Sequence, residues 1–100
     1  MGAIQHDVVI VEGYGGDQKT ERLKDWIRQL SDDQQKYFTW SEPLINGYIF
    51  VLMWPDGSKE GWMESDEADT LRCKFLARAK ELGLYPIHFS WGDYGYIFHR

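Results

Sequence analysis

An unbroken run of seven apolar residues, Tyr48–Trp54, limits the folds open to this chain more than any other segment. In an extended strand, alternate side chains point to opposite faces of the sheet. One face then receives Ile49, Val51 and Met53, and the other receives four apolar side chains: Tyr48, Phe50, Leu52 and Trp54. The run therefore predicts a strand with two apolar faces, each of which needs a cover.

Five further strands are expected around this run. Asp7–Glu12 is apolar on both alternations, which is typical of an interior strand covered on both faces. Lys36–Trp40 is expected to be a short strand, and Lys59–Glu64 is expected to pair with the central run through a Pro-Asp-Gly-Ser hairpin turn. The tail of the chain predicts two strands on either side of Gly92–Gly95.

Two amphipathic helices are expected, near Gln18–Leu30 and Asp66–Leu82. Each segment carries apolar residues at helical spacing along one side. Asp17 or Thr20 can cap the first helix, and Ser65 can cap the second. The helices therefore have one side each that must pack against a sheet.

The expected order of elements is β-α-β-β-β-α-β-β, within a single domain over residues 1–100. This order predicts an α+β fold: a two-layer sandwich of a mostly antiparallel sheet with two helices packed on one face. Aromatic residues make up 16% of the chain, and a domain of this size cannot easily bury all of their rings in one core. The second face of the sheet is therefore expected to expose aromatic side chains.

An exposed apolar face of this kind exceeds what monomeric proteins usually show, so we expect another surface to cover it. A second copy of the chain, a partner protein or the chain's own Ser31–Pro43 segment would serve, and Phe89 and Trp91 add to the face in some registers. We predict a non-catalytic interaction module that forms a homodimer through this face, with Trp54 near its centre. The predicted partner-binding residues are Tyr48, Phe50, Leu52, Trp54 and Trp62.

The segment Asn46–Met53 resembles the octapeptide of RNA-recognition motifs, which it matches at Gly47, Tyr48, Phe50 and Val51. The βαββαβ order of that family is also close to the one expected here, and the resemblance implies bases stacked on aromatic side chains. The segment departs from the motif at Ile49 and Met53, and a strand at Lys59–Glu64 has no place in that topology. The net charge of −5 also argues against nucleic acid as the partner. A small-ligand or single-stranded nucleic-acid binder that uses the same aromatic residues is the alternative function.

Acidic residues outnumber basic ones, 16 to 11, and five acids fall within Glu60–Asp69. Most of these lie at the start of a predicted helix, where the helix macrodipole favours negative charge. An acidic inhibitor-like protein that docks a basic partner is a third hypothesis. The glycines of Gly13–Asp17 fit no phosphate-binding loop motif and indicate a turn before a helix.

No catalytic or metal-binding motif is visible in the sequence. His6, His88 and His99 lack metal-site spacing, so any metal ligands would have to come from distant strands. Cys73 is expected to be a surface thiol, and no cofactor is expected. An enzyme, which the residues do not support, would use a pocket between the Gly13–Asp17 loop and the strand ends. The single cysteine and the lack of a signal peptide or apolar span predict a cytoplasmic protein.

Overall fold

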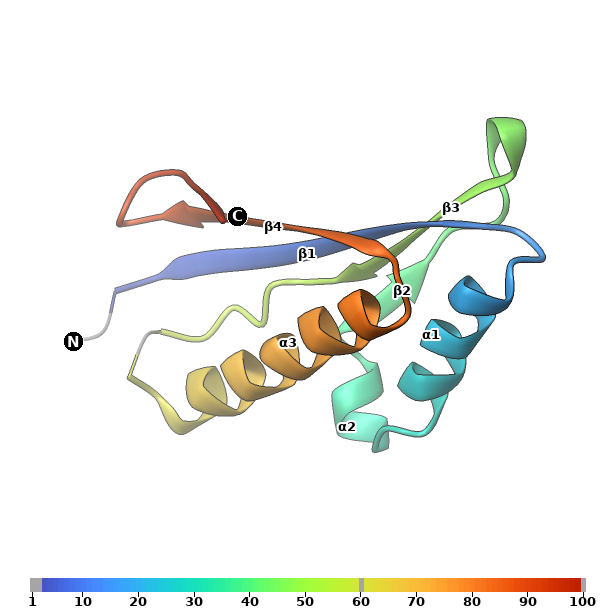
Figure 1. The fold of residues 1–100 in the computed structure, drawn as a ribbon. Coiled ribbons are helices and arrows are strands. Elements are labelled where there is room, and N and C mark those ends of the chain that lie inside the picture. The colour runs from blue at the N-terminus through green and yellow to red at the C-terminus, as the bar shows by residue number, and fades with distance from the viewer. Residues whose placement is uncertain (1–2, 60, 100) are drawn as a thin grey trace.

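The computed structural model describes residues 3–59 and 61–99, and it has a layer of helices against one face of a sheet (Figure 1). The sheet is antiparallel throughout, with the strand order β2-β3-β1-β4-β5. Its strands are β1 (Gln5–Tyr14), β2 (Phe38–Trp40), β3 (Tyr48–Met53), β4 (Tyr85–Gly92) and β5 (Ile97–His99). The helices are α1 (Gln18–Arg28), α2 (Asp32–Gln35) and α3 (Met63–Glu81), with a single 3₁₀ turn, η1 (Ile45–Gly47), before β3.

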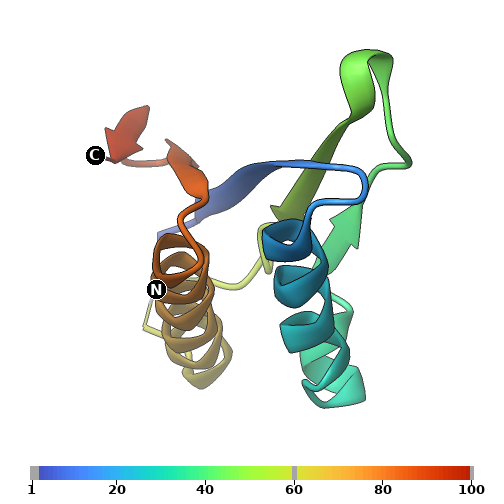
Figure 2. The same cartoon turned by 45° about the vertical axis from the view of Figure 1, so that its right-hand side comes forward.

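The helices lie on one side of the sheet, which Figure 2 shows from a second direction. The α+β prediction, with helices on one face of a mostly antiparallel sheet, is confirmed. The first four strands and the two long helices form two interleaved β-α-β units, because β3 lies between β1 and β2. This is the split β-α-β arrangement, to which β5 adds a fifth strand at the β4 edge.

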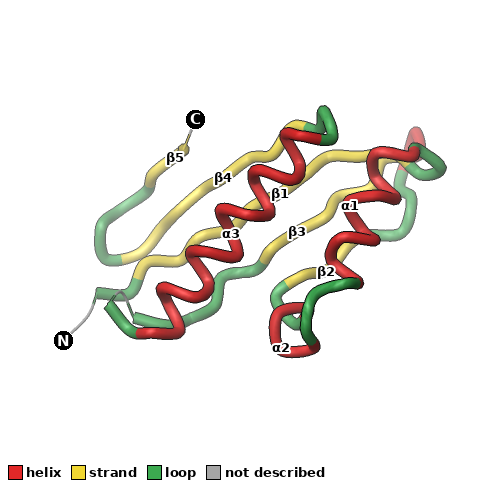
Figure 3. Tube along the Cα trace, turned by 60° about the horizontal axis from the view of Figure 1, so that its bottom comes forward, coloured by secondary structure: helices red, strands yellow, loops and turns green. Residues whose placement is uncertain are grey.

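The core lies between the sheet and the two long helices, α1 and α3, which cross the strands obliquely (Figure 3). Phe75 of α3 is fully buried and packs edge-on against the ring of Phe38 with centroids 5.0 Å apart. Trp26 of α1 stacks on the same Phe75 ring. Burying side chains of this size contributes about 1.5–3 kcal/mol each, so this layer supplies most of the stability of the single chain. The strand residues of the core are Val9, Val11, Phe38, Ile49, Val51 and Met53.

The loop between β1 and α1 is a turn that ends in a helix cap, as the glycines predicted. The Asp17 side chain accepts a hydrogen bond from the Lys19 backbone N–H, which caps α1. The hydroxyl of Thr20, which is fully buried, accepts a hydrogen bond of 3.0 Å from the Tyr14 backbone N–H. A Cβ atom on Gly13 would overlap the Thr20 side chain, so glycine lets the helix approach the strand at this point.

The strand predicted at Lys59–Glu64 is wrong. Between Met53 and Met63 the chain forms no strand that the structure describes, and Lys59 makes only an isolated bridge to Ile4; Glu60 lies outside the described residues. The Pro-Asp-Gly-Ser turn closes on itself instead, because the Asp56 carboxylate accepts hydrogen bonds from the Ser58 N–H and hydroxyl. The expected element order therefore has one strand too many.

Two boundaries in the helical layer also differ from the prediction. The helix expected to start after a Ser65 cap starts at Met63 with Trp62 in the cap position, and Ser65 is buried inside it. The segment after the first helix contains a short helix that was not predicted, α2, which a reciprocal capping box between Ser31 and Gln34 begins. None of the helices in the described part of the chain combines the length and apolar composition needed to cross a bilayer.

Candidate functional sites

The face of the sheet turned away from the helices has no helix over it in the described part of the chain (Figures 1 and 2). This surface, termed the open sheet face, consists of the even-numbered residues of β1 and β3, the odd-numbered residues of β4, and the neighbouring Trp54 and Phe98. At its middle, Ile10 lies opposite both Leu52 and Ile87. The prediction that β1 is covered on both faces is therefore wrong, because Val8 and Ile10 are only partly buried.

Aromatic rings gather at the two ends of the open sheet face, with aliphatic side chains between them. At one end, the rings of Tyr14 and Tyr48 lie 4.6 Å apart, and Phe50 stacks beyond Tyr48. At the other end, Phe89 stacks on Trp91 at 6.0 Å, and Trp91 also contacts the His6 ring. The face therefore has two aromatic ends joined by an aliphatic centre.

Four of the five predicted partner-binding residues lie together on this face: Tyr48, Phe50, Leu52 and Trp54. Trp54 is 47% exposed, and its indole N–H donates a 2.6 Å hydrogen bond to the Thr39 hydroxyl. Its polar atom is therefore satisfied within the chain, while half of its ring surface is available for contact. Trp62 precedes α3 and does not belong to the sheet, because the strand that would have carried it is absent.

Among the described residues, charged groups are scarce on the open sheet face. The five strands contain no lysine or arginine, and Glu12 and His6, both on β1, are the face's acid and imidazole. The β1-α1-β2-β3-α3-β4 order does match the βαββαβ order of the RNA-recognition motif, and Tyr48 and Phe50 point to the open face as base stacking requires. The cations that would hold a phosphate backbone are missing from the strands.

A cluster of polar side chains lies on the opposite side of the sheet, at the edge formed by β4 and β5. Asp7 of β1 lies opposite Ser90 of β4, and His88 of β4 lies opposite His99 of β5. Directly opposite residues share a face, so these four side chains meet on the side from which α3 approaches. They are termed the His–Asp cluster: Asp7, His88, Ser90 and His99.

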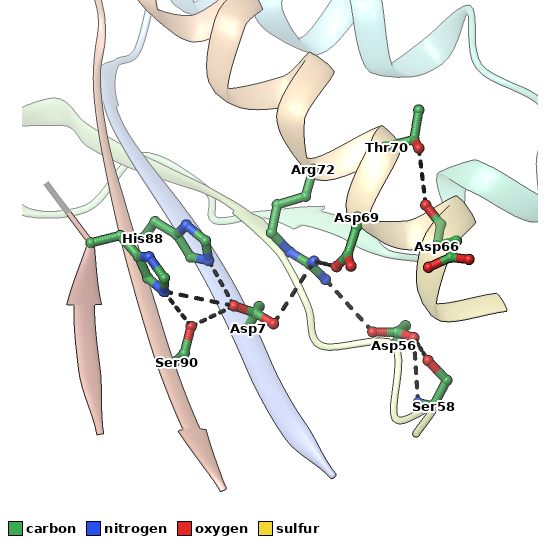
Figure 4. Close-up of polar contacts among 10 residues, drawn as sticks. Asp7, Asp56, Ser58, Asp66, Asp69, Thr70, Arg72, His88 and Ser90 are labelled. Atoms are coloured by element: carbon green, nitrogen blue, oxygen red, sulfur yellow. Dashed lines mark hydrogen bonds and ion pairs between the residues drawn. The ribbon is translucent and has the colours of Figure 1, made fainter. Parts of the chain in front are cut away.

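Hydrogen bonds in the His–Asp cluster converge on one carboxylate oxygen (Figure 4). Asp7 Oδ1 accepts from His88 Nε2 at 2.8 Å and from the Ser90 hydroxyl. Because Ser90 donates its hydroxyl proton to Asp7, the Ser90 oxygen accepts a hydrogen bond from His99 Nε2, which lies 2.6 Å away. The two imidazole rings stack with centroids 3.8 Å apart and an interplanar angle of 12°. Both rings thus turn Nε2 towards Asp7.

Arg72 of α3 reaches the same carboxylate from the helical layer and is 3% exposed. Its Nη1 lies 2.6 Å from Asp69 Oδ1 and 3.9 Å from Asp7 Oδ2, and its Nη2 lies 3.6 Å from Asp56 Oδ1. Three carboxylates therefore surround one guanidinium group. With neutral imidazoles, the described residues of this region carry two negative charges in excess.

The environment keeps Asp7 ionised. Burial alone would raise the pKa of Asp7, but hydrogen bonds from His88 and Ser90, together with the Arg72 charge, outweigh it and lower the pKa to about 2. Burial lowers the pKa of His99, and the neighbouring His88 acts in the same direction. At neutral pH the cluster therefore combines a carboxylate with a neutral imidazole, which is the state in which both can bind a metal ion.

A pocket of about 430 Å³ lies between α2 and the first turns of α3, away from the Gly13–Asp17 loop that the enzyme hypothesis would use. Both acidic and basic side chains line it, including Asp33, Glu64, Glu67, Lys36 and Lys74. This mixed lining therefore indicates no particular class of ligand.

Sequence reasoning missed the His–Asp cluster, although a signal for it was present. His88 and Ser90 alternate with Ile87, Phe89 and Trp91, so a strand there has one polar side. That pattern could have identified a polar surface but not Asp7 as its partner, because Asp7 lies 81 residues from His88 in the chain. Comparison of the sequence with known protein families and curated proteins, and of the fold with solved structures, finds no match.

Proposed function

We propose that this chain is a non-catalytic interaction module that forms a homodimer by packing two open sheet faces against each other. The observation that carries the proposal is the contrast across the sheet: helices cover one apolar face, and the other apolar face has no cover in the described part of the chain. Exposed apolar surface of this extent is typical of interfaces. Two sheets packed face to face are also a stable arrangement in their own right, with a shared core about 10 Å thick.

The size of the open sheet face supports this. The five strands contain 30 residues, which at about 3.3 Å per residue and about 4.8 Å between strands give a plane of roughly 500 Å² before the relief of the side chains is added. A standard stable interface buries roughly 800 Å² on each partner. The face is thus large enough for a modest dimer, and Trp54 is placed to be one of its main contacts because its N–H is already bonded to Thr39.

The charges on the face support a second copy over nucleic acid as the occupant. Single-stranded nucleic acid needs a basic groove along its backbone, and the strands supply no lysine or arginine. Another copy of the chain presents the same apolar surface and needs no cations. The net charge of −5 opposes association only weakly, because screening limits it to about 10 Å at 0.1 M salt.

The arrangement of Glu12 and His6 also favours one symmetry of the dimer. A two-fold axis parallel to β1 would place Glu12 over its own copy, and such juxtaposed like charges are costly. A two-fold axis perpendicular to the strands and passing near Val9 instead places Glu12 over the partner's His6. It also places each aromatic end of the open sheet face over the opposite aromatic end of the partner's face. We therefore propose that β1 runs in opposite directions in the two subunits.

The test is sedimentation equilibrium of the unmodified chain and of two tryptophan variants with closely similar exposure. Trp54 is 47% exposed on the open sheet face and Trp62 is 49% exposed off it. We expect the unmodified chain and Trp62→Glu to be dimers at ~100 µM, and Trp54→Glu to be a folded monomer with a dissociation constant at least ~30-fold higher, equivalent to about 2 kcal/mol.

Two results would reject the homodimer. The first is a monomer of the unmodified chain at this concentration. The second is equal weakening by the two tryptophan variants, which would place the contact elsewhere. Salt-dependent binding of mixed single-stranded RNA that Tyr48→Ala abolishes would replace the homodimer with the nucleic-acid alternative.

A further inference from the structure

We infer that the His–Asp cluster is a binding site for a divalent transition-metal ion such as Zn²⁺, with Asp7 Oδ1, His88 Nε2 and His99 Nε2 as its three protein ligands. Imidazole nitrogen and carboxylate oxygen are both ordinary zinc ligands. The cluster lies on the side of the sheet opposite the open sheet face, so this inference is independent of the proposed homodimer.

The distances between the three ligand atoms suit an ion placed between them. Asp7, His88 and His99 each offer one ligand atom within 4.8 Å of those of the other two. Tetrahedral coordination with bonds of about 2.1 Å places ligand atoms about 3.4 Å apart. The distance from Asp7 Oδ1 is 2.8 Å to His88 Nε2 and 4.0 Å to His99 Nε2, so each needs to change by only about 0.6 Å.

Each imidazole must first take the tautomer with its proton on Nδ1, which replaces the Nε2 hydrogen bonds to Asp7 and Ser90 and frees the Nε2 lone pair. The stacked rings must then turn for these lone pairs to converge on one ion, and the fold leaves room for that motion. His99 belongs to β5, a three-residue strand at the edge of the sheet, and its side chain is 38% exposed. Rotation of this ring away from His88 opens the stack. The Ser90 hydroxyl, 2.6 Å from His99 Nε2, remains beside the site and can orient the ligand Asp7. Three protein ligands leave a fourth position for water.

The charge balance favours a dication. Asp7, Asp56 and Asp69 face Arg72, which gives the described residues of the region two negative charges in excess when the imidazoles are neutral. A Zn²⁺ ion cancels both. Arg72 repels such an ion, but its closest partner is Asp69 at 2.6 Å, and it lies 3.9 Å from the non-ligating oxygen of Asp7. Arg72 thus sits behind the carboxylate and leaves Oδ1 for the metal.

The three ligands come from three different strands, so a bound ion ties β5 to β4 and β1. The β4–β5 ladder spans only three residue pairs, and its β5 residues are exposed. Metal binding to the folded chain stabilises it by mass action. We therefore expect Zn²⁺ to raise the melting temperature and to slow amide exchange in β5.

The experiment titrates Zn²⁺ into the untagged full chain by isothermal calorimetry, and compares His99→Ala with His6→Ala. His6 is the matched control, because it is also a strand histidine but lies on the open sheet face. We expect one Zn²⁺ per chain, an affinity at least ~100-fold lower in His99→Ala, and an affinity within about threefold of the unmodified chain in His6→Ala, since even residues behind metal ligands cost ~10–100-fold when replaced.

A second measurement on the unmodified chain needs no variant and guards against misfolding of His99→Ala. In ¹⁵N spectra of the histidine rings, Zn²⁺ should move the Nε2 resonances of His88 and His99 and leave those of His6 in place. Equal loss of affinity in the two variants, movement of the His6 resonances alone, or Zn²⁺ binding by the unmodified chain no tighter than by His99→Ala would each overturn the site. Trp54→Glu should bind Zn²⁺ normally, so failure of the homodimer leaves this test intact.

Discussion

The two faces of the sheet carry similar residues, yet they have different surroundings. Val9, Val11 and Val51 are at most 1% exposed beneath α1 and α3. Ile10 and Leu52, one position along the same strands, are only partly buried. The difference is therefore set by the side of the strand on which a residue falls and not by how apolar it is.

A strand with two apolar faces needs a packed layer on each face. The number of amphipathic helices in the chain decides how many of these layers the chain itself provides. Helices α1 and α3 suffice for one face. The open sheet face is as apolar as a protein core, but no helix of the described residues packs on it. Burial of this face against a second molecule would therefore be favourable. If the proposed homodimer forms, stability and association depend on opposite sides of one sheet.

The largest effect is expected at the centre of the covered face. Phe75→Ala should cost about 3–5 kcal/mol of unfolding free energy, because Phe75 is fully buried among aromatic rings and a cavity would remain. Urea denaturation at low protein concentration measures this. A loss under about 1 kcal/mol would mean that the helical layer does not hold the core as described.

Adjacent positions on β3 separate the two faces most directly. Met53→Ala, at a fully buried position, should cost about 2–5 kcal/mol at every protein concentration. Leu52→Ala, on the open sheet face, should cost less than about 1.5 kcal/mol at low concentration and more as the concentration rises, because a dimer contact acts by mass action. A concentration-independent cost for both variants would contradict the proposed homodimer.

A smaller effect is expected where the covered face meets the start of α1. Gly13→Ala places a methyl group against the buried Thr20, and such overpacking costs about 1–3 kcal/mol. Thermal unfolding of Gly13→Ala, Thr20→Ala and the double variant measures the coupling. The double variant should cost less than the sum of the single variants, and simple additivity would rule out the contact.

The smallest effect concerns the hydrogen bond between Trp54 and Thr39. Thr39→Val removes the acceptor of the indole N–H and should weaken self-association by about 1 kcal/mol, or roughly fivefold, because the N–H would be buried without a partner in the dimer. Sedimentation of Thr39→Val beside Thr39→Ser, which keeps the hydroxyl, isolates the bond. Equal dissociation constants for these two variants would argue against burial of Trp54.

Much of the fold followed from local patterns in the sequence. The alternation in Tyr48–Trp54 gave the correct face for every residue from Tyr48 to Met53, and the apolar spacing located both long helices. The extra strand at Lys59–Glu64 was predicted because Pro-Asp-Gly-Ser resembles a hairpin turn. A turn sequence fixes only local geometry, however, and here Asp56 bonds to Ser58 and reaches Arg72 instead. The short α2 helix was missed although its capping box, Ser31 and Gln34, is visible in the sequence.

The two candidate sites also differ in how far the sequence predicts them. The β3 part of the open sheet face could be predicted, because its residues alternate within a single strand, whereas β1 was wrongly expected to be covered on both faces. The His–Asp cluster could not, because it depends on strand register between Asp7, His88 and His99, which no local pattern specifies. Trp62 was assigned to the sheet face only through the incorrect strand. Sites built within one strand are therefore more accessible to sequence reasoning than sites assembled across a sheet.

The central place of β1 also has a consequence for how the chain folds during synthesis. Both neighbours of β1 come later in the chain, with β3 ending at Met53 and β4 ending at Gly92. At a translation rate of about 5–20 residues per second, β1 waits roughly 4–16 s after its own synthesis before β4 is complete. During that interval its β-branched segment Val8–Val11 has an unpaired edge, which makes it a potential site of aggregation and a natural target for chaperones.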